Sequence, residues 1–110
     1  MHRKRFTIRA LQGLLEKIPH GKVVTYQEIA RALGNPKAAR AIGVLCSKNP
    51  EPEKYPCFRV VRSDGTLGGY SGNDGIRGKI QKLEHDGVFV RDKKIVDFKN
   101  RTYFFPLPHA

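Results

Sequence analysis

Cys57 is the residue of this sequence whose type and setting are best suited to chemistry. It is one of two cysteines and stands in Pro56-Cys57-Phe58-Arg59-Val60, at the start of a β-prone run. The reactive form of a cysteine is the thiolate, which a neighbouring base or positive charge favours. Phe58 supplies neither, whereas Arg59 brings a positive charge. A buried structural thiol is the alternative interpretation, and it is the commoner fate of a free cysteine.

The second cysteine, Cys46, shares an apolar helix side with Ile42 and Leu45, which favours a place in the core. It stands eleven residues before Cys57, a spacing that matches no zinc-binding pattern. We therefore expect no metal and no cofactor. The basic N-terminus lacks the apolar run of a signal peptide, so we expect a reduced, intracellular protein of the cytoplasm or nucleoid.

Two further features are weaker evidence for a site. His85 and Asp86 are adjacent, but neighbouring helical residues point in different directions, and a histidine near a helix end is a common helix-dipole feature. No convincing partners are evident for His2, His20 and His109. The loop 68–72 surrounds Tyr70 with glycines and lacks the spacing of a phosphate-binding loop. It either forms the wall of a flat pocket or is a flexible connector.

A helix-turn-helix is predicted in the first half of the chain. Thr25 and Glu28 fit a capping box for a helix that ends at Gly34. Asn35-Pro36 predicts the immediate start of the next helix, which ends near Asn49-Pro50. Two short helices with so short a connection are typical of the helix-turn-helix.

The other elements follow from hydrophobic periodicity and turn residues. A fourth helix places Ile76, Ile80 and Leu83 on one apolar face and ends near Gly87. The rest are a helix over 6–18, a β-prone pair at 23–24, a loop over 50–57, a β-prone run over 58–62, a turn at 63–65, a hairpin over 88–98 and an apolar tail over 103–108 that packs back.

The charge of the chain favours a polyanionic partner. Its 110 residues carry a net charge of +11. Residues 1–50 hold 10 Lys and Arg against 2 Asp and Glu, and residues 51–110 hold 11 against 8. Phosphate neutralisation by such an excess supplies most non-specific affinity for nucleic acid. General solubility is the alternative explanation of this charge.

Alanines surround Arg40 on the second helix of the predicted helix-turn-helix and would let that helix approach DNA closely. The alternative is that these alanines pack against another helix and that Arg40 is solvated.

Taken together, these segments resemble the C-terminal, DNA-binding and active-site domain of the O6-alkylguanine-DNA alkyltransferase family. The resemblance follows the family in order and spacing over residues 6–88. It rests on Gly21-Lys22-Val23-Val24-Thr25-Tyr26-Gln27-Glu28-Ile29-Ala30, Gly34-Asn35-Pro36-Lys37-Ala38-Ala39-Arg40-Ala41-Ile42-Gly43, Asn49-Pro50, Pro56-Cys57-Phe58-Arg59-Val60-Val61, Gly69-Tyr70-Ser71-Gly72 and Lys82-Leu83-Glu84-His85-Asp86-Gly87.

The resemblance implies one α/β domain over residues 1–110, of winged-helix type, with a helix-turn-helix and a small β-sheet. Such a domain binds double-stranded DNA containing O6-alkylguanine in the minor groove and flips the damaged base, which the duplex otherwise shields. It implies Cys57 as the nucleophile that accepts the alkyl group irreversibly, Asn49 as the brace of the active-site turn, and Asp86 at the position of a relay carboxylate. Contacts to the base are expected from Tyr26, Arg40, Val60, Tyr70, Ser71 and Gly72. Contacts to DNA are expected from Tyr26, Gln27, Lys37, Ala38, Ala39, Arg40 and Arg59.

Phe58 departs from the family pattern, in which a histidine follows the cysteine and passes a proton toward the carboxylate. Loss of a positioned base costs about 10²–10⁴ in rate. In length the chain resembles the alkyltransferase-like proteins, which bind alkylated guanine without repairing it. Those proteins replace the cysteine, whereas this chain keeps it. The length also fits one domain of a longer fusion protein.

Three functions therefore stay open. They are repair by alkyl transfer to Cys57, a non-catalytic lesion sensor that flags damage for downstream repair proteins, and a winged-helix regulator. The last is disfavoured because readers of sequence need no pocket. We take a monomer as the default state.

Overall fold

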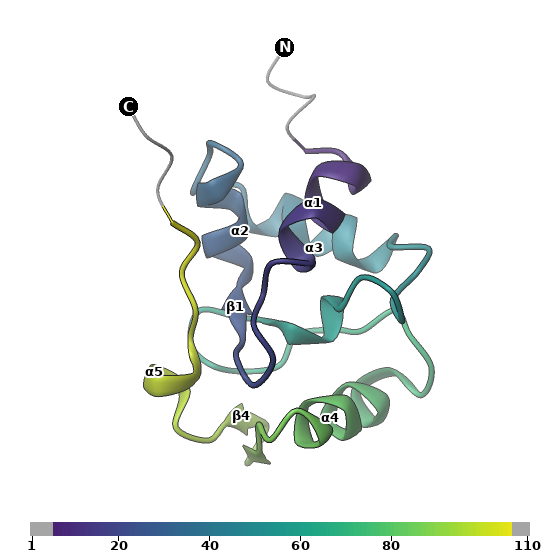
Figure 1. Cartoon of the computed structure of the whole chain (residues 1–110), viewed down its shortest axis with the longest axis vertical. Helices are drawn as coiled ribbons and strands as arrows, with labels where there is room; N and C mark the ends of the chain where they lie inside the picture. The colour runs from purple at the N-terminus through teal and green to yellow at the C-terminus, as the bar shows by residue number, and fades with distance from the viewer. Residues whose placement is uncertain (1–5, 107–110) are drawn as a thin grey trace.

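A short pair of parallel strands runs through the middle of the molecule, between two groups of helices (Figure 1). The computed structural model describes residues 6–106. In chain order its elements are α1 (Ile8–Leu15), β1 (Val24–Thr25), α2 (Tyr26–Ala32), α3 (Ala39–Ser47), the 3₁₀ helix η2 (Cys57–Arg59), β2 (Val60–Val61), α4 (Gly75–His85), β3 (Val90–Arg91), β4 (Lys94–Ile95) and α5 (Phe98–Arg101). This arrangement confirms the predicted mixture of helices with small sheets. No helix in the described part of the chain is long and apolar enough to span a membrane.

The strand pair divides the interior into two cores. Successive side chains of a strand point to opposite faces, and Val24 and Val60 accordingly face one core while Val23 and Val61 face the other. The helical core, which includes both cysteines, consists of Leu11, Leu15, Ile18, Val24, Ile29, Ala30, Ile42, Cys46, Cys57, Val60 and Phe105. The hairpin core consists of Val23, Val61, Leu67, Leu83, Val88 and Ile95.

Helix α2 begins at half of the predicted capping box. The Thr25 hydroxyl accepts a hydrogen bond from the backbone N–H of Glu28 at 3.0 Å, as expected. The Glu28 carboxylate does not reach back, because it accepts hydrogen bonds from the Arg31 guanidinium and from the backbone N–H of Phe105 at 2.8 Å. Glu28 therefore joins α2 to the C-terminal segment.

Helix α3 begins three residues later than Asn35-Pro36 predicts, with Ala39 and not Pro36 as its first residue. The Asn35 side-chain oxygen accepts a hydrogen bond from the backbone N–H of Lys37 at 3.1 Å. The backbone carbonyl of Asn35 accepts a second one from the backbone N–H of Ala38 at 3.0 Å. These bonds close a turn, so Asn35 is not available to cap a helix. Helix α3 starts at Ala39 without a side-chain cap.

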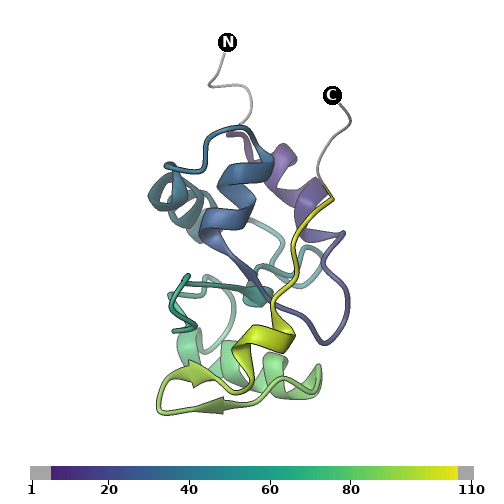
Figure 2. The same cartoon turned by 90° about the vertical axis from the view of Figure 1, so that its left-hand side faces the viewer.

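The hairpin and the C-terminal segment were both predicted correctly. Strands β3 and β4 are antiparallel, and Asp92 and Lys93 between them have positive φ angles of 51° and 66°, as a tight hairpin turn requires. After α5 the chain runs back past β1 toward α2 (Figure 1, Figure 2). Phe105 there is only 5% exposed. Residues 107 and 108 of the predicted tail lie outside the described residues.

Candidate active site

A cavity of about 750 Å³ opens between the helix-turn-helix, η2 and the glycine-rich loop. Its lining residues are Tyr26, Ala39, Arg40, Gly43, Cys46, Ser47, Cys57, Arg62, Gly68, Gly69, Tyr70 and Ser71. Six of the predicted site residues are among them, from segments that lie far apart in the sequence. The six are Tyr26, Ala39, Arg40, Cys57, Tyr70 and Ser71.

The other predicted base-contacting and DNA-contacting residues lie outside this lining. Val60 is fully buried in the helical core, and Gly72 lies against the ring of Tyr70. Gln27 and Lys37 are exposed on α2 and on the turn before α3. Ala38 is half-buried directly before α3. Their contacts with DNA stay predictions.

Cys57 is 4% exposed and stands at the first position of η2. Of the predicted β-prone run over 58–62, only Val60–Val61 forms a strand. Its sulfur lies 4.0 Å from the Ser71 hydroxyl oxygen, which is 3.3 Å from the carbonyl oxygen of Cys46. The Ser71 hydroxyl donates to that carbonyl and keeps a lone pair for the thiol. One serine thus links the backbone of α3 to the candidate nucleophile.

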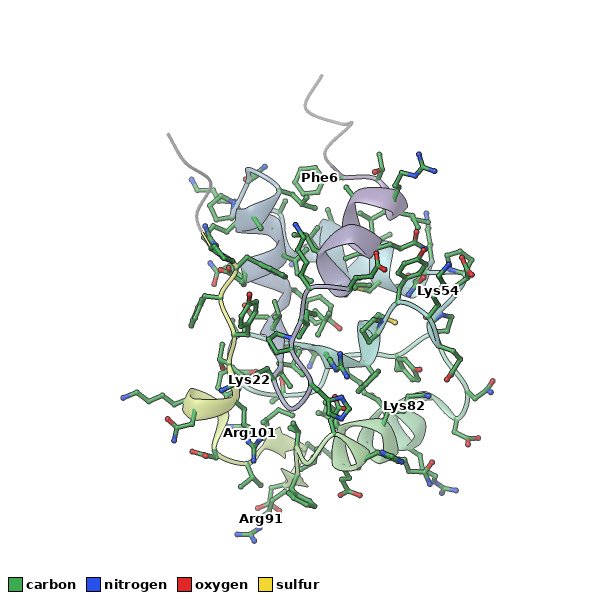
Figure 3. The ribbon with its side chains drawn as sticks, viewed as in Figure 1. Phe6, Lys22, Lys54, Lys82, Arg91 and Arg101 are labelled. Atoms are coloured by element: carbon green, nitrogen blue, oxygen red, sulfur yellow. The ribbon has the colours of Figure 1, made fainter. Side chains whose placement is uncertain are left out.

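Asn49 braces the turn that precedes Cys57. Its side chain is 4% exposed, donates to the carbonyl of Tyr55 at 3.1 Å and accepts from the backbone N–H of Glu51 at 3.1 Å. The Tyr55 carbonyl also accepts from the backbone N–H of Cys57 at 2.7 Å. Lys82, labelled in Figure 3, holds the same turn to α4 through an ion pair with Glu53 at 2.6 Å.

Two tyrosines, Tyr26 and Tyr70, are among the residues that line the cavity. Burial and the neighbouring thiols of both cysteines raise the pKa of Tyr26. A Cβ at Gly68, where φ is +70°, would lie 2.6 Å from the phenol oxygen of Tyr26, so this position requires glycine. Burial, and then the Cys57 thiol, raise the pKa of Tyr70 to about 12. The Tyr70 hydroxyl is buried and has no hydrogen-bond partner among residues 6–106, so its hydrogen-bonding capacity is unused there.

Lys79 is a buried residue that the sequence reasoning missed. Its ammonium group donates hydrogen bonds to the carbonyls of Val60 at 2.6 Å, Gly69 at 3.0 Å and Leu67. The residue has 0% exposure, and burial lowers the pKa of its amine to about 8. Lys79 therefore ties α4 to β2 and to the glycine-rich loop behind the cavity.

The position of Lys79 in the sequence is itself a signal that its charge is buried. It lies three residues after Ile76 and four before Leu83, on the stripe that was predicted to be apolar. In the structure Ile76 is 44% exposed, and the buried residues of α4 are Gly78, Lys79 and Leu83. A lysine on such a stripe is buried only with partners for its charge.

Arg59 and Asp86 form an ion pair outside the lining of the cavity. The guanidinium donates to both carboxylate oxygens, at 2.6 Å and 3.2 Å, and to the carbonyl of Ile18 at 3.2 Å. The expectation that Arg59 acts on the thiol therefore finds no supporting contact. His20, for which no partner was predicted, has its Nδ1 3.1 Å from both the guanidinium and the carboxylate.

Phe58 is half-buried, and its ring lies 5.1 Å from the Arg59 guanidinium carbon and 6.0 Å from the Lys82 nitrogen. It lines a second, shallow hollow of about 290 Å³ with Gln81, Lys82, His85 and Asp86. The lining of the main cavity includes no histidine and no carboxylate. Within residues 6–106 no three His, Cys, Asp or Glu side chains gather closely enough to bind a metal ion. The cavity lining thus includes two thiols, phenol hydroxyls and cations, but no carboxylate or imidazole base.

The chain is similar to proteins of one known family. The family described as 6-O-methylguanine DNA methyltransferase, DNA binding domain, matches residues 6–88. A bifunctional methyltransferase/endonuclease of Picrophilus torridus is 46% identical over 88% of this chain and 33% of its own length. The methylated-DNA–protein-cysteine methyltransferase of Rattus norvegicus is 47% identical over 76% of this chain and 39% of its own.

Among solved structures, Atl1 of S. pombe in complex with damaged DNA containing O6-carboxymethylguanine has a TM-score of 0.69 and 28% identity. That match covers 92% of this chain and 95% of Atl1, whereas the chain spans only 33% and 39% of the two curated relatives described above. With the family matched over residues 6–88, most of its length, the chain belongs to the family of the 6-O-methylguanine DNA methyltransferase DNA-binding domain.

Proposed function

We propose that the protein recognises O6-alkylguanine in double-stranded DNA, flips the damaged base into the main cavity and accepts its alkyl group on Cys57. The observation that carries this proposal is the meeting of Cys57 with Tyr70, Ser71 and Arg40 around one cavity. The unpartnered Tyr70 hydroxyl offers a hydrogen bond to the base. Flipping is needed because the alkylated oxygen is out of reach inside the duplex.

The transfer itself is a displacement at the alkyl carbon. The sulfur of Cys57 forms a bond to that carbon while the bond from carbon to O6 breaks. The proton that leaves the thiol balances the proton that the released guanine takes up. Each protein molecule reacts once, since its sulfur stays alkylated. Because no histidine or carboxylate lines the cavity, we expect this step to be slow.

A second candidate function is lesion recognition without transfer. Phe58 and the absence of a base from the cavity lining favour it. The similarity to Atl1 in complex with damaged DNA also supports it. In this case the bound lesion is passed to a downstream repair protein. An endonuclease is one candidate class, because a relative combines methyltransferase and endonuclease in its name.

Intact-protein mass spectrometry after incubation with a duplex bearing one O6-methylguanine distinguishes the two functions. Transfer predicts one added methyl group in the wild type and none in Cys57→Ala. A Cys46→Ala control should still gain the methyl group, because burial raises the pKa of Cys46 to about 12 and keeps that thiol protonated.

Each other outcome points to a different function. Tight lesion binding without any mass change would exclude repair and leave the sensor. Equal affinity for the lesion duplex and a plain duplex would exclude both and favour a regulator. The Atl1 complex adds O6-carboxymethylguanine as a second lesion worth testing in the same assay.

A further inference from the structure

Arg62 lies at the cavity on a rigid piece of backbone. It follows β2, its backbone N–H donates to the carbonyl of Thr66 at 2.8 Å, and its carbonyl accepts from Gly65 at 2.9 Å. These two bonds close the turn directly after the strand. The Arg62 side chain starts from this fixed backbone, is exposed and belongs to the lining of the cavity.

The other cations nearby are already committed. All three N–H groups of the Lys79 ammonium are donated to backbone carbonyls. Arg59 is held by Asp86 and by the carbonyl of Ile18. Arg40 stands on α3, the helix proposed to enter the duplex. Arg62 makes no side-chain hydrogen bond or ion pair with any residue of the described part of the chain.

The cavity also favours negative charge as a whole. Arg40 and Arg62 are among its lining residues and no carboxylate is. The positive charge of Arg62 lies close enough to the Tyr26 phenol to lower its pKa, against the larger effect of burial. An uncompensated guanidinium beside a pocket is suited to a carboxylate, which it can bind through two parallel hydrogen bonds.

We propose that Arg62 binds the carboxylate of an O6-carboxyalkyl adduct, so that the protein prefers anionic lesions to O6-methylguanine. This proposal rests on the proposed function and names the class of adduct that the cavity selects. It assigns to Arg62 a specificity-determining contact with the end of the adduct. The guanine itself contacts Tyr70.

The test compares binding to three duplexes that differ only at one guanine, which is plain, O6-methylated or O6-carboxymethylated. Every protein carries Cys57→Ala, so that transfer does not consume the lesion. We expect this parent to bind the carboxymethyl duplex about tenfold more tightly than the methyl duplex. Arg62→Gln should remove that preference while keeping discrimination against plain guanine, and Arg62→Lys should retain part of it.

Arg91→Gln is the matched control. It removes the same charge from β3, where Arg91 is exposed and points away from the body of the protein (Figure 3), and it should leave the preference unchanged. A parent that binds both lesions equally, or an Arg62→Gln protein that keeps the preference, would overturn the proposal.

Two further results would also overturn the assignment of Arg62 to the adduct, each for its own physical reason. If Arg62→Gln weakens binding to all three duplexes alike and lowers the salt slope by about 1, Arg62 contacts a backbone phosphate and not the adduct. If the parent fails to distinguish either lesion from plain guanine, the proposed function itself fails.

Discussion

The carboxylate of Asp86 is only 4% exposed, and the Arg59 guanidinium holds both of its oxygens. Phe58 lines the same shallow hollow as this carboxylate but has no group that transfers a proton. The carboxylate that the family resemblance places in a proton relay is therefore held by Arg59, and Phe58 cannot connect it to the thiol of Cys57. The burial of Asp86 is sustained by Arg59, so its structural role does not depend on the relay.

Replacing Phe58 by histidine should accelerate alkyl transfer. A histidine at this position would follow Cys57 directly and share the hollow with Asp86. A positioned base contributes about 10²–10⁴ in rate, and we expect Phe58→His to gain at least about tenfold. The measurement is the single-turnover rate of methyl transfer from an O6-methylguanine duplex.

Phe89→His provides the matched control for this experiment. Phe89 is 57% exposed before β3, so the same substitution there should leave the rate unchanged. An equal rate for Phe58→His and the wild type would mean that another group already supplies the base, or that chemistry does not limit the rate.

At the scale of elements, local patterns predicted α1, α2, the hairpin and the fourth helix, because the spacing of apolar residues and the turn residues carry this information. The start of α3 was missed because an asparagine can close a turn as well as cap a helix. The ion pair of Arg59 with Asp86 joins positions 27 apart in the sequence, and no local pattern predicts such a contact. The grouping of Tyr26, Arg40, Cys57 and Tyr70 came from family resemblance.

The link between α4 and β2 should make stability depend on pH through Lys79. The pKa of its amine in the folded protein is lowered by burial to about 8 from 10.5. Between these values the unfolded chain binds a proton that the folded protein has lost, so stability rises with pH. From pH 7.5 to 9.5 this contribution amounts to about 2 kcal/mol.

Comparison with Lys79→Met isolates this contribution. The raised pKa of Cys46 acts in the opposite direction, because the unfolded thiol loses its proton first and stability then falls. Both proteins share that effect, so the difference between their free energies of unfolding should grow by about 2 kcal/mol in favour of the wild type across this window. Urea unfolding followed by circular dichroism measures it. A constant difference would show that water reaches the ammonium group.

At the scale of the whole molecule, the C-terminal segment connects the two halves. Thr102 pairs with Val23 beside β1, and Phe105 then enters the helical core and meets Tyr103 edge-on at 5.5 Å. The backbone carbonyl of Phe105 accepts a hydrogen bond from the Arg31 guanidinium of α2 at 3.1 Å. The orientation of α2 on the sheet therefore depends on residues at the far end of the chain.

Phe105→Ala should accordingly destabilise the whole fold, by about 3–5 kcal/mol, the usual cost of removing a buried phenylalanine. Phe104→Ala is the matched control: Phe104 is 66% exposed, so its loss should change the free energy of unfolding by less than about 0.5 kcal/mol. Thermal unfolding of both variants measures the difference. Because Phe105 contacts the core that contains Cys57, its loss should also weaken lesion binding, whereas Phe104→Ala should not. Equal stability of the two variants would mean that the segment 102–106 lies on the surface without supporting α2.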